Sequence, residues 1–404
     1  MADDGQNIDW AARRAEIAKR QQRAYIDRIK AGVGDMSPDG AMENDARVYT
    51  DEARYEAELQ TIFTDYPLVA GLSQDIKDPG SVMLFEELGQ SIIIVRTKTG
   101  EVGAYLNMCT HRAMALVEEP CKRNLLTCPF HAWSFDLEGN LVRVPEDEAF
   151  SNVDFESRKL IKVPVKEWNG LIFIIPRAGD EEIDVEAHLG EFAVELEQLE
   201  FSGSIPVKSG TLDAECNWKY ALDTYGEGYH FPSLHKENVA LFTTTETLHE
   251  QFGKHHRTGW AEVAMREYMD KPEEEWPEPT YGGIHYIFPN TIIFYGSVGD
   301  MEPFVQIFRH YPTSTDSMRT YFNVYSRAEI KDEAHRKLIE EAGYDGTRHV
   351  VETEDYWVAS EGYKRLKSAP PGFKVLYGAN EWSLQDKHRA IADAAGMPLE
   401  IYDK

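Results

Sequence analysis

The chain has 404 residues, of which 42% are hydrophobic and 28% charged, and 42 Lys and Arg against 70 Asp and Glu give a net charge of -28. Two or three domains are expected at this length, and a mean hydropathy of -0.48 argues against a membrane-embedded chain. So acidic a surface repels phosphate backbones and anionic lipid headgroups. We therefore expect a soluble globular protein that binds neither nucleic acid nor a membrane.

The first residues and the cysteines indicate a cytoplasmic protein. Asp3 and Asp4 stand where a secretory signal has basic residues, and the longest apolar runs are only about as long as a strand. Four cysteines are too few for a disulfide scaffold. They are expected to be buried thiols or metal ligands.

Two helices are predicted in an N-terminal segment over residues 1–65. The first, over 8–31, has helix formers throughout and one apolar stripe, made of Trp10, Ile17, Tyr25 and Ile29. A helix of this kind either packs on another part of the assembly or forms a solvated arm. The second is predicted over 51–63. We expect the segment to pack with the C-terminal domain.

The pattern then changes to short β-type runs between turn signals, over 82–85, 91–95, 102–107, 132–137 and 171–175. These runs predict a small antiparallel β-domain over 66–176. The rest of the chain, 177–404, is mixed. Helices are predicted there over 186–199, 328–342, 354–366 and 383–395, and strands over 284–295, 304–311 and 318–325. We predict an α+β fold in which helices cover one face of an antiparallel sheet.

Two loops of the β-domain each carry one cysteine and one histidine. Cys109 and His111 stand in the first loop, and Cys128 and His131 follow after sixteen intervening residues. An i, i+2 pair points one way in an extended chain, and Pro129 fixes a turn that brings the second pair together. Such a cage can hold zinc, but zinc fingers pair Cys with Cys and His with His. The mixed order fits a two-iron cluster with two thiolates on one iron and two imidazoles on the other.

The stretches 107–112 (NMCTHR) and 128–133 (CPFHAW) resemble the Rieske [2Fe-2S] motif. The resemblance implies that the cluster is held by Cys109, His111, Cys128 and His131. Ala113 stands where the family commonly has glycine, a departure that removes no ligand. Cys121 and Cys216 are predicted to be structural thiols.

A second group of metal-ligand types lies in the stretch 217–235 (NWKYALDTYGEGYHFPSLH). His230 and His235 diverge by about 140° on an unbroken helix, but Pro232 should open the helix and let the second imidazole approach the first. Glu227, one turn earlier, is within reach of the ring of His230 as an orienting carboxylate. Ordinary surface histidines are the alternative interpretation.

A carboxylate would complete a facial triad for Fe(II). The candidates are Glu352, Glu354 and Asp355, and spacing does not choose among them. Nearly the whole chain, including Asn217-Trp218-Lys219, resembles the α subunits of the Rieske non-heme iron oxygenases. In that family the third ligand is an aspartate that opens a helix, which implies Asp355. The resemblance also implies a helix-grip-like catalytic domain after the Rieske domain.

In this family an acid before the first iron histidine connects it to a cluster histidine of the neighbouring subunit in a head-to-tail trimer. The matching residues are Glu227, where most relatives have aspartate, and His131. Asp223 matches a position near the iron, and a structural polar role is its alternative. The resemblance thus implies catalytic roles for Glu227 and Asp223, and a homotrimer, alone or with a second subunit type in an α3β3 assembly.

The chain has no Gly-x-Gly-x-x-Gly turn after a strand, so a separate NAD(P)H-dependent reductase must supply electrons, directly or through a ferredoxin. The resemblance implies a terminal oxygenase that uses O2 to hydroxylate a hydrophobic, aromatic or polycyclic substrate, as in aromatic hydrocarbon catabolism. Oxidative O- or N-demethylation is the alternative within the family. A non-catalytic Rieske electron carrier and a zinc hydrolase are the alternatives from other classes.

Aromatic-rich strands over 285–295 and 304–311 are candidates to line the substrate pocket, although about half of their residues should be core. Three nearby histidines are predicted either to contact the substrate or to lie in solvated loops: His249, His255 and His256.

Overall fold

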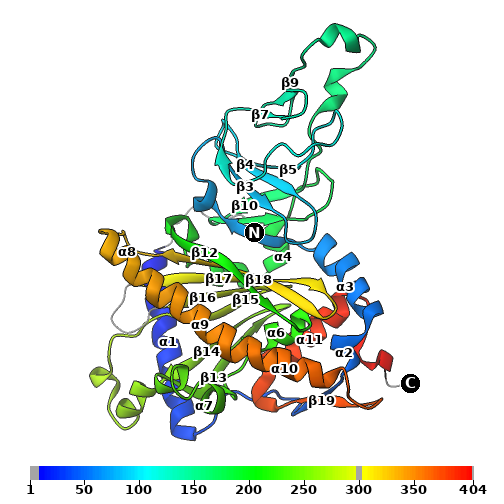
Figure 1. Ribbon diagram of the computed structural model, residues 1–404. Coiled ribbons are helices and arrows are strands. Elements are labelled where there is room, and N and C mark those ends of the chain that lie inside the picture. The colour runs from blue at the N-terminus through cyan, green and yellow to red at the C-terminus, as the bar shows by residue number, and fades with distance from the viewer. Residues whose placement is uncertain (1–8, 297–302, 403–404) are drawn as a thin grey trace. The chain divides into compact units, whose positions relative to one another are not determined.

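The computed structural model describes residues 9–296 and 303–402, so Asp3, Asp4 and the start of the predicted first helix lie outside it. The described chain divides into two compact units, coloured by chain position in Figure 1. The smaller unit comprises residues 63–188 and 201–203. The larger contains the other described residues, so the N-terminal helices share a unit with the C-terminal ones. No described helix has an apolar stretch long enough to cross a bilayer.

The smaller unit contains three antiparallel sheets, as the short β-type runs predicted. One sheet has the order β5-β4-β3-β6, with strands Val102–Leu106, Ile92–Arg96, Ser81–Phe85 and Cys121–Lys122. A second has the order β7-β8-β9, with strands Leu126–Thr127, Ser134–Phe135 and Leu141–Arg143. The third has the order β10-β11-β2, with strands Val165–Trp168, Leu171–Ile174 and Leu68–Leu72. The core of this unit includes Cys109, Cys128 and Trp133.

The larger unit is built on a seven-stranded antiparallel sheet. Its order is β12-β18-β17-β16-β15-β14-β13, with strands Ile205–Ala214, Ser317–Ser326, Phe304–Ser314, Thr291–Gly296, Gly283–Ile287, His255–Glu262 and Thr243–Phe252. A separate ribbon pairs β1 and β19, which are Met42–Asp45 and Lys374–Tyr377.

The α-helices are α1 (Trp10–Ala31), α2 (Arg47–Thr50), α3 (Glu52–Asp65), α4 (Val185–Leu189), α5 (Phe192–Glu197), α6 (Trp218–Asp223), α7 (Phe231–Leu234), α8 (Glu333–Ile339), α9 (Thr347–Val350), α10 (Tyr356–Leu366) and α11 (Trp382–Ala394). Two π-helical segments, Glu340–Gly346 and Val351–Asp355, join α8, α9 and α10 into one continuous helix.

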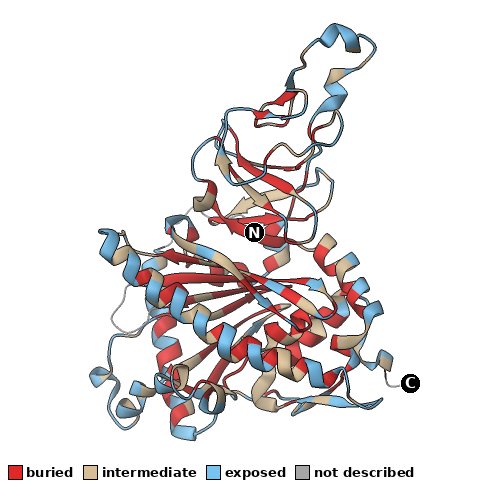
Figure 2. Ribbon diagram, in the orientation of Figure 1, coloured by how far each residue is buried: buried red, intermediate tan, exposed pale blue. Residues whose placement is uncertain are grey.

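Helices cover both faces of the seven-stranded sheet, where the sequence pattern led us to expect cover on one. On one face, Phe192 of α5 stacks on His255, and α1 packs on β13 and β14. On the other face, Tyr344 of the long helix stacks on Phe322. Phe322 and His256 lie on the same face, because the strand register connects them across the sheet. His255 is the neighbour of His256 in β14 and therefore points to the opposite face. Figure 2 shows the central strands buried accordingly.

Two predicted elements were wrong in extent, and three strands were not predicted. The strand predicted over 284–295 is the hairpin β15–β16, because Pro289 has no N–H to donate and stands at the turn between them. The helix predicted over 186–199 is split into α4 and α5 at Gly190, which has φ +55°. Strands β12, β13 and β14 were not predicted, because threonine, histidine and charged residues obscure their alternation.

We predict that acid weakens this unit through three buried histidines of the sheet. Burial, with His249, Lys387 and His255 nearby, lowers the pKa of His256 well below its ordinary value. Burial also lowers the pKa of His285 and of His310 to about 3. The unfolded chain binds these protons below a pKa of about 6.5 and the folded chain does not, so stability falls as pH falls.

The free energy of unfolding should therefore drop by about 2 kcal/mol for each of His285 and His310 between pH 7 and pH 5, and His256 should add to this drop. Urea titrations at the two pH values measure this drop. The variant His285→Gln should lose about 2 kcal/mol less than the wild type over the same interval. Equal losses in the two proteins would contradict the assignment.

Candidate metal and cluster sites

The two Cys-His loops have the same backbone shape. In each loop the residue four after the cysteine, Ala113 or Ala132, is left-handed, with φ +61° and +57°. Its N–H donates to the carbonyl of Cys109 in one loop and Cys128 in the other, at 2.8 and 3.0 Å. The alanine methyl group costs about 1–2 kcal/mol in this conformation. The first loop thus keeps, with Ala113, the turn that glycine commonly makes in the family.

The four predicted cluster ligands pair like with like. The Cys128 thiol is hydrogen-bonded to the Cys109 thiol, and burial followed by this neighbour raises the pKa of Cys109. The rings of His111 and His131 have centroids 4.8 Å apart. Two thiols that face each other and two imidazoles that face each other match a cluster in which two thiolates bind one iron and two imidazoles bind the other.

The thiols and the ring nitrogens of these residues also fit a cluster. Both thiols are buried and neither cysteine forms a disulfide. The Nδ1 atoms of His111 and His131 are buried and have no hydrogen-bond partner, as atoms reserved for a metal would. Burial, followed by His131 and Arg112, lowers the pKa of His111, which favours the neutral ring that metals require.

Aromatic side chains hold the two imidazoles. The indole of Trp133 is buried and stacks on His111, with ring centroids 4.8 Å apart and planes 9° apart. Phe130 lies over His131 at 3.8 Å and is 52% exposed. The cysteines are thus buried, whereas the histidine side of the site reaches the protein surface.

The second group of ligands lies between α6 and β13. Helix α6 ends at Asp223 and α7 begins at Phe231. Pro232 stands in the first turn of α7, where a missing N–H costs nothing. His230 and His235 flank this short helix at its two ends. Their ring centroids lie 4.8 Å apart, so the two imidazoles meet as predicted. The predicted cause was wrong, because the chain does not open at Pro232, which lies inside the short helix that joins the two histidines.

Asp355 meets both imidazoles. Its Oδ1 lies 3.7 Å from Nε2 of His230 and 3.3 Å from Nε2 of His235, and the ligating atoms of the three residues lie within 4.8 Å of one another. Nε2 of His230 is buried and has no hydrogen-bond partner. Two nitrogens and one carboxylate oxygen aimed at one point suit a divalent transition metal.

The structure separates the three candidate carboxylates of the long helix. Glu352 pairs with Arg348 at an exposed position, at 2.7 Å. Glu354 contacts Nδ1 of His235 at 2.5 Å and accepts from Nδ2 of Asn238 at 2.7 Å. Only Asp355 faces the two Nε2 atoms. Burial lowers the pKa of His235, but Asp355 and then Glu354 outweigh it, so the net shift is upward.

Glu227 contacts the outer nitrogen of His230, as predicted, although from a turn and not from a helix. One carboxylate oxygen contacts Nδ1 of His230, and the other accepts the backbone N–H of the same residue at 3.1 Å. Each imidazole therefore has a carboxylate on Nδ1 and its Nε2 turned toward Asp355. The sequence indicated the first of these carboxylates and missed the second.

Asp223 lies in a different buried cluster. Its carboxylate accepts from the hydroxyl of Tyr49 at 2.6 Å and lies 3.0 Å from Nε2 of His388 and 3.6 Å from Nζ of Lys387. Burial raises its pKa, but His388, Lys387 and Tyr49 outweigh burial, so the net shift is downward. The structure does not bring Asp223 to the two imidazoles.

The remaining predicted residues belong to the fold, and all of them are buried except Cys121, which is partly exposed. His249, His255 and His256 lie on β13 and β14 and not in solvated loops, and Nε2 of His249 lies 3.1 Å from Asp386. Cys121 and Cys216 are free thiols. Burial raises the pKa of Cys216 to about 12, which suits an inert structural residue.

Two family models match the chain. The Rieske [2Fe-2S] domain matches residues 67–164, and the ring hydroxylating alpha subunit (catalytic domain) matches residues 204–396.

Several characterised proteins are similar to the chain. It is 25% identical over 341 residues to the carnitine monooxygenase oxygenase subunit of Escherichia coli (strain K12), covering 82% of this chain and 86% of that one. It is 28% identical to benzene 1,2-dioxygenase subunit alpha of Pseudomonas putida, covering 56% and 53%. It is 30% identical to the chloroplastic choline monooxygenase of Beta vulgaris, covering 51% and 47%.

Two solved structures show the same fold. The quaternary ammonium Rieske monooxygenase in complex with L-carnitine gives a TM-score of 0.73 at 20% identity, covering 88% of this chain and 96% of that one. Naphthalene 1,2-dioxygenase from Rhodococcus sp. gives a TM-score of 0.64 at 19% identity, covering 86% and 94%.

The carboxylate of Asp355 should be needed for one metal ion and not for the others. We predict that Asp355→Asn lowers the iron content of reconstituted protein from about three to about two per chain, because one charged ligand is lost while the cluster loops are untouched. Elemental analysis with visible spectroscopy of the cluster measures both. Asp345→Asn, on the same long helix but paired with Lys208, is the matched control. Three irons in Asp355→Asn would remove this residue from the site.

Proposed function

Because the chain belongs to the Rieske non-heme iron oxygenase α subunits, which are oxidoreductases, we propose that it is a cytoplasmic terminal oxygenase that oxidises a small organic substrate. Its cofactors are a [2Fe-2S] cluster and a mononuclear iron. Members of this family take electrons from a separate reductase. For this chain we propose an NAD(P)H-dependent one, acting directly or through a ferredoxin.

One observation supports this function most strongly. The ligating atoms of His230, His235 and Asp355 lie within 4.8 Å of one another in the same chain as a Rieske domain. A non-catalytic electron carrier would have no use for that convergence. A zinc hydrolase, conversely, would have no use for the Cys-His loops.

The residues of the chain have distinct tasks in this proposal. The chemistry that the two groups supply when bound is one-electron transfer at the cluster and reduction of dioxygen at the mononuclear iron. His230, His235 and Asp355 would hold the iron, and it would supply the reduction of dioxygen next to the bound substrate. Glu227 holds the proton on Nδ1 of His230, so that Nε2 stays free for the metal. Cys109, His111, Cys128 and His131 hold the cluster.

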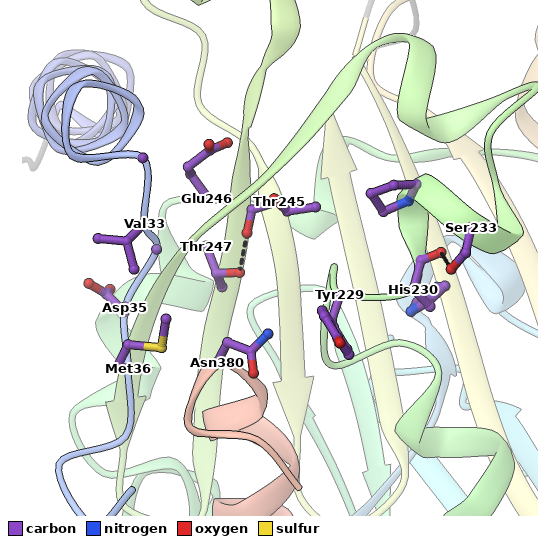
Figure 3. Close-up of a pocket in the computed structure, with 13 residues that line it drawn as sticks. Val33, Asp35, Met36, Tyr229, His230, Ser233, Thr245, Glu246, Thr247 and Asn380 are labelled. Carbon is purple, nitrogen blue, oxygen red and sulfur yellow. Dashed lines mark hydrogen bonds between the residues drawn. The ribbon is translucent and has the colours of Figure 1, made fainter. Parts of the chain in front are cut away.

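We propose that electrons enter the catalytic site beside Glu227, from the His131 side of a neighbouring copy in a homotrimer. Glu227 itself is buried, but its partner His230 lies at an accessible surface. A pocket of 590 Å³ lies there, with Tyr229 and His230 on one side and Val33, Asp35 and Met36 on the other (Figure 3). Tyr229 is 70% exposed, which leaves an aromatic surface for a partner domain.

For the substrate we favour a quaternary ammonium compound, oxidised at a carbon next to nitrogen, over an aromatic hydrocarbon. Relatives named for carnitine match over 82% of the chain, whereas the one named for benzene matches over 56%. The net charge of -28 also attracts a cation. Oxidation of an N-methyl carbon leads to demethylation. The aromatic substrate suggested by the aromatic-rich strands is the second candidate.

Oxygen uptake tests the function and the substrate class together. With NADH and a surrogate reductase, the iron-loaded protein should consume oxygen with choline, carnitine or γ-butyrobetaine and much more slowly with benzene or naphthalene. Uptake with the aromatic compounds alone would overturn the preferred substrate class. If fully iron-loaded protein gives no uptake with either class, the carrier would become the better interpretation.

Glu227 offers a test of electron entry. We predict that Glu227→Gln keeps a normal cluster spectrum but slows turnover about 10- to 100-fold, because the charged partner of His230 is lost. Glu227→Asp, which restores the residue common among relatives, should recover part of the rate. Glu237→Gln, an exposed change in the same loop region, is the control. Unchanged turnover in Glu227→Gln would remove the residue from the pathway.

A further inference from the structure

Two successive acids of the long helix enclose one imidazole. Successive helical residues point about 100° apart, so neighbours rarely serve one group. Here Oδ1 of Asp355 lies 3.3 Å from Nε2 of His235, and Oε2 of Glu354 lies 2.5 Å from Nδ1 of the same ring. The two ring nitrogens are on opposite edges, so the shorter acid reaches one edge and the longer acid reaches round to the other.

The carboxylate of Glu354 is held at both of its oxygens. While Oε2 contacts the imidazole, Oε1 accepts from Nδ2 of Asn238 at 2.7 Å. Asn238 is fixed in turn, because its N–H donates to the carbonyl of His235 at 3.1 Å and its Oδ1 accepts from Val239 N at 2.6 Å. The side chain of Glu354 is only 24% exposed. A doubly bonded, mostly covered carboxylate has a defined position, unlike a solvated surface acid.

We infer that Glu354 is the positioning residue of the second metal-binding histidine, with Asn238 as its anchor, and this inference rests on the proposed function. Its contact requires Nδ1 of His235 to carry the proton, which leaves Nε2 as the lone pair facing the metal. Glu354 thereby does for His235 what Glu227 does for His230. Unlike Glu227, Glu354 lies on the helix that also supplies Asp355. The same helix therefore places Asp355 and sets the orientation of His235.

Fe(II) affinity measures this role without turnover. The protein is stripped of the mononuclear metal under anaerobic conditions, with the cluster retained, and retitrated with Fe(II) against a chromophoric chelator. Glu354→Gln should bind Fe(II) about 10- to 100-fold more weakly than the wild type. Asn238→Ser should weaken binding less. Glu352→Gln, the same change two residues away at an exposed ion pair, should bind as the wild type does.

Thermal melting separates positioning from a purely structural role. Before Fe(II) is added, Glu354→Gln should melt at the wild-type temperature, and only the upward shift on adding Fe(II) should shrink. A lower melting temperature of the stripped variant with unchanged Fe(II) affinity would overturn the inference, as would wild-type affinity in a folded variant. If Glu354→Gln loses the cluster spectrum and does not fold, the Fe(II) affinity of Asn238→Ser becomes the test. Wild-type Fe(II) affinity in Asn238→Ser would then overturn the inference. A wild type that takes up no Fe(II) beyond the cluster would instead contradict the proposed function.

Discussion

The whole catalytic unit depends on which nitrogen each imidazole turns inward. Two histidines share a metal only if both present an unprotonated nitrogen to the same point, and a carboxylate on the opposite nitrogen enforces this. Glu227 and Glu354 supply those carboxylates, and Asp355 faces both free Nε2 atoms. In the proposed site, three of these five side chains would bind the metal and two would fix the orientation of the ligands.

The surrounding fold holds these side chains by fixing irregular backbone. The turn between α6 and α7, which carries Glu227, is bound by α11, since Ser383 donates to the carbonyl of Gly226 and Lys387 donates to that of Leu222 at 2.9 Å. A π-helical segment ends at Asp355, and such segments often occur at functional sites. One face of the seven-stranded sheet supports both elements, because Tyr225, just after α6, contacts Phe308, and Tyr344 of the long helix stacks on Phe322, the register partner of Phe308.

The pairing of cysteine with histidine inside each cluster loop was predictable from spacing, and the choice of one carboxylate for the metal site was not, for a physical reason. Within each loop the cysteine and the histidine are two or three positions apart, so local backbone geometry alone brings them together. Asp355 lies 120 residues beyond His235, and only tertiary packing of the long helix distinguishes it from Glu352 and Glu354. Spacing alone left all three acids open, and family resemblance indicated Asp355. Nothing in the sequence indicated that Glu354 orients a histidine. The fold class was predictable, whereas polar strands such as β13 and the break in the helix before Glu227 were not.

The central claim is that one metal ion binds where two Nε2 atoms and one oxygen of Asp355 converge. Crystals of iron-reconstituted protein, with data collected at wavelengths on either side of the iron absorption edge, test this most directly. We expect an anomalous peak for the cluster and a separate peak within bonding distance of all three side chains. A cluster peak alone, or a second peak away from His230, His235 and Asp355, would contradict the account.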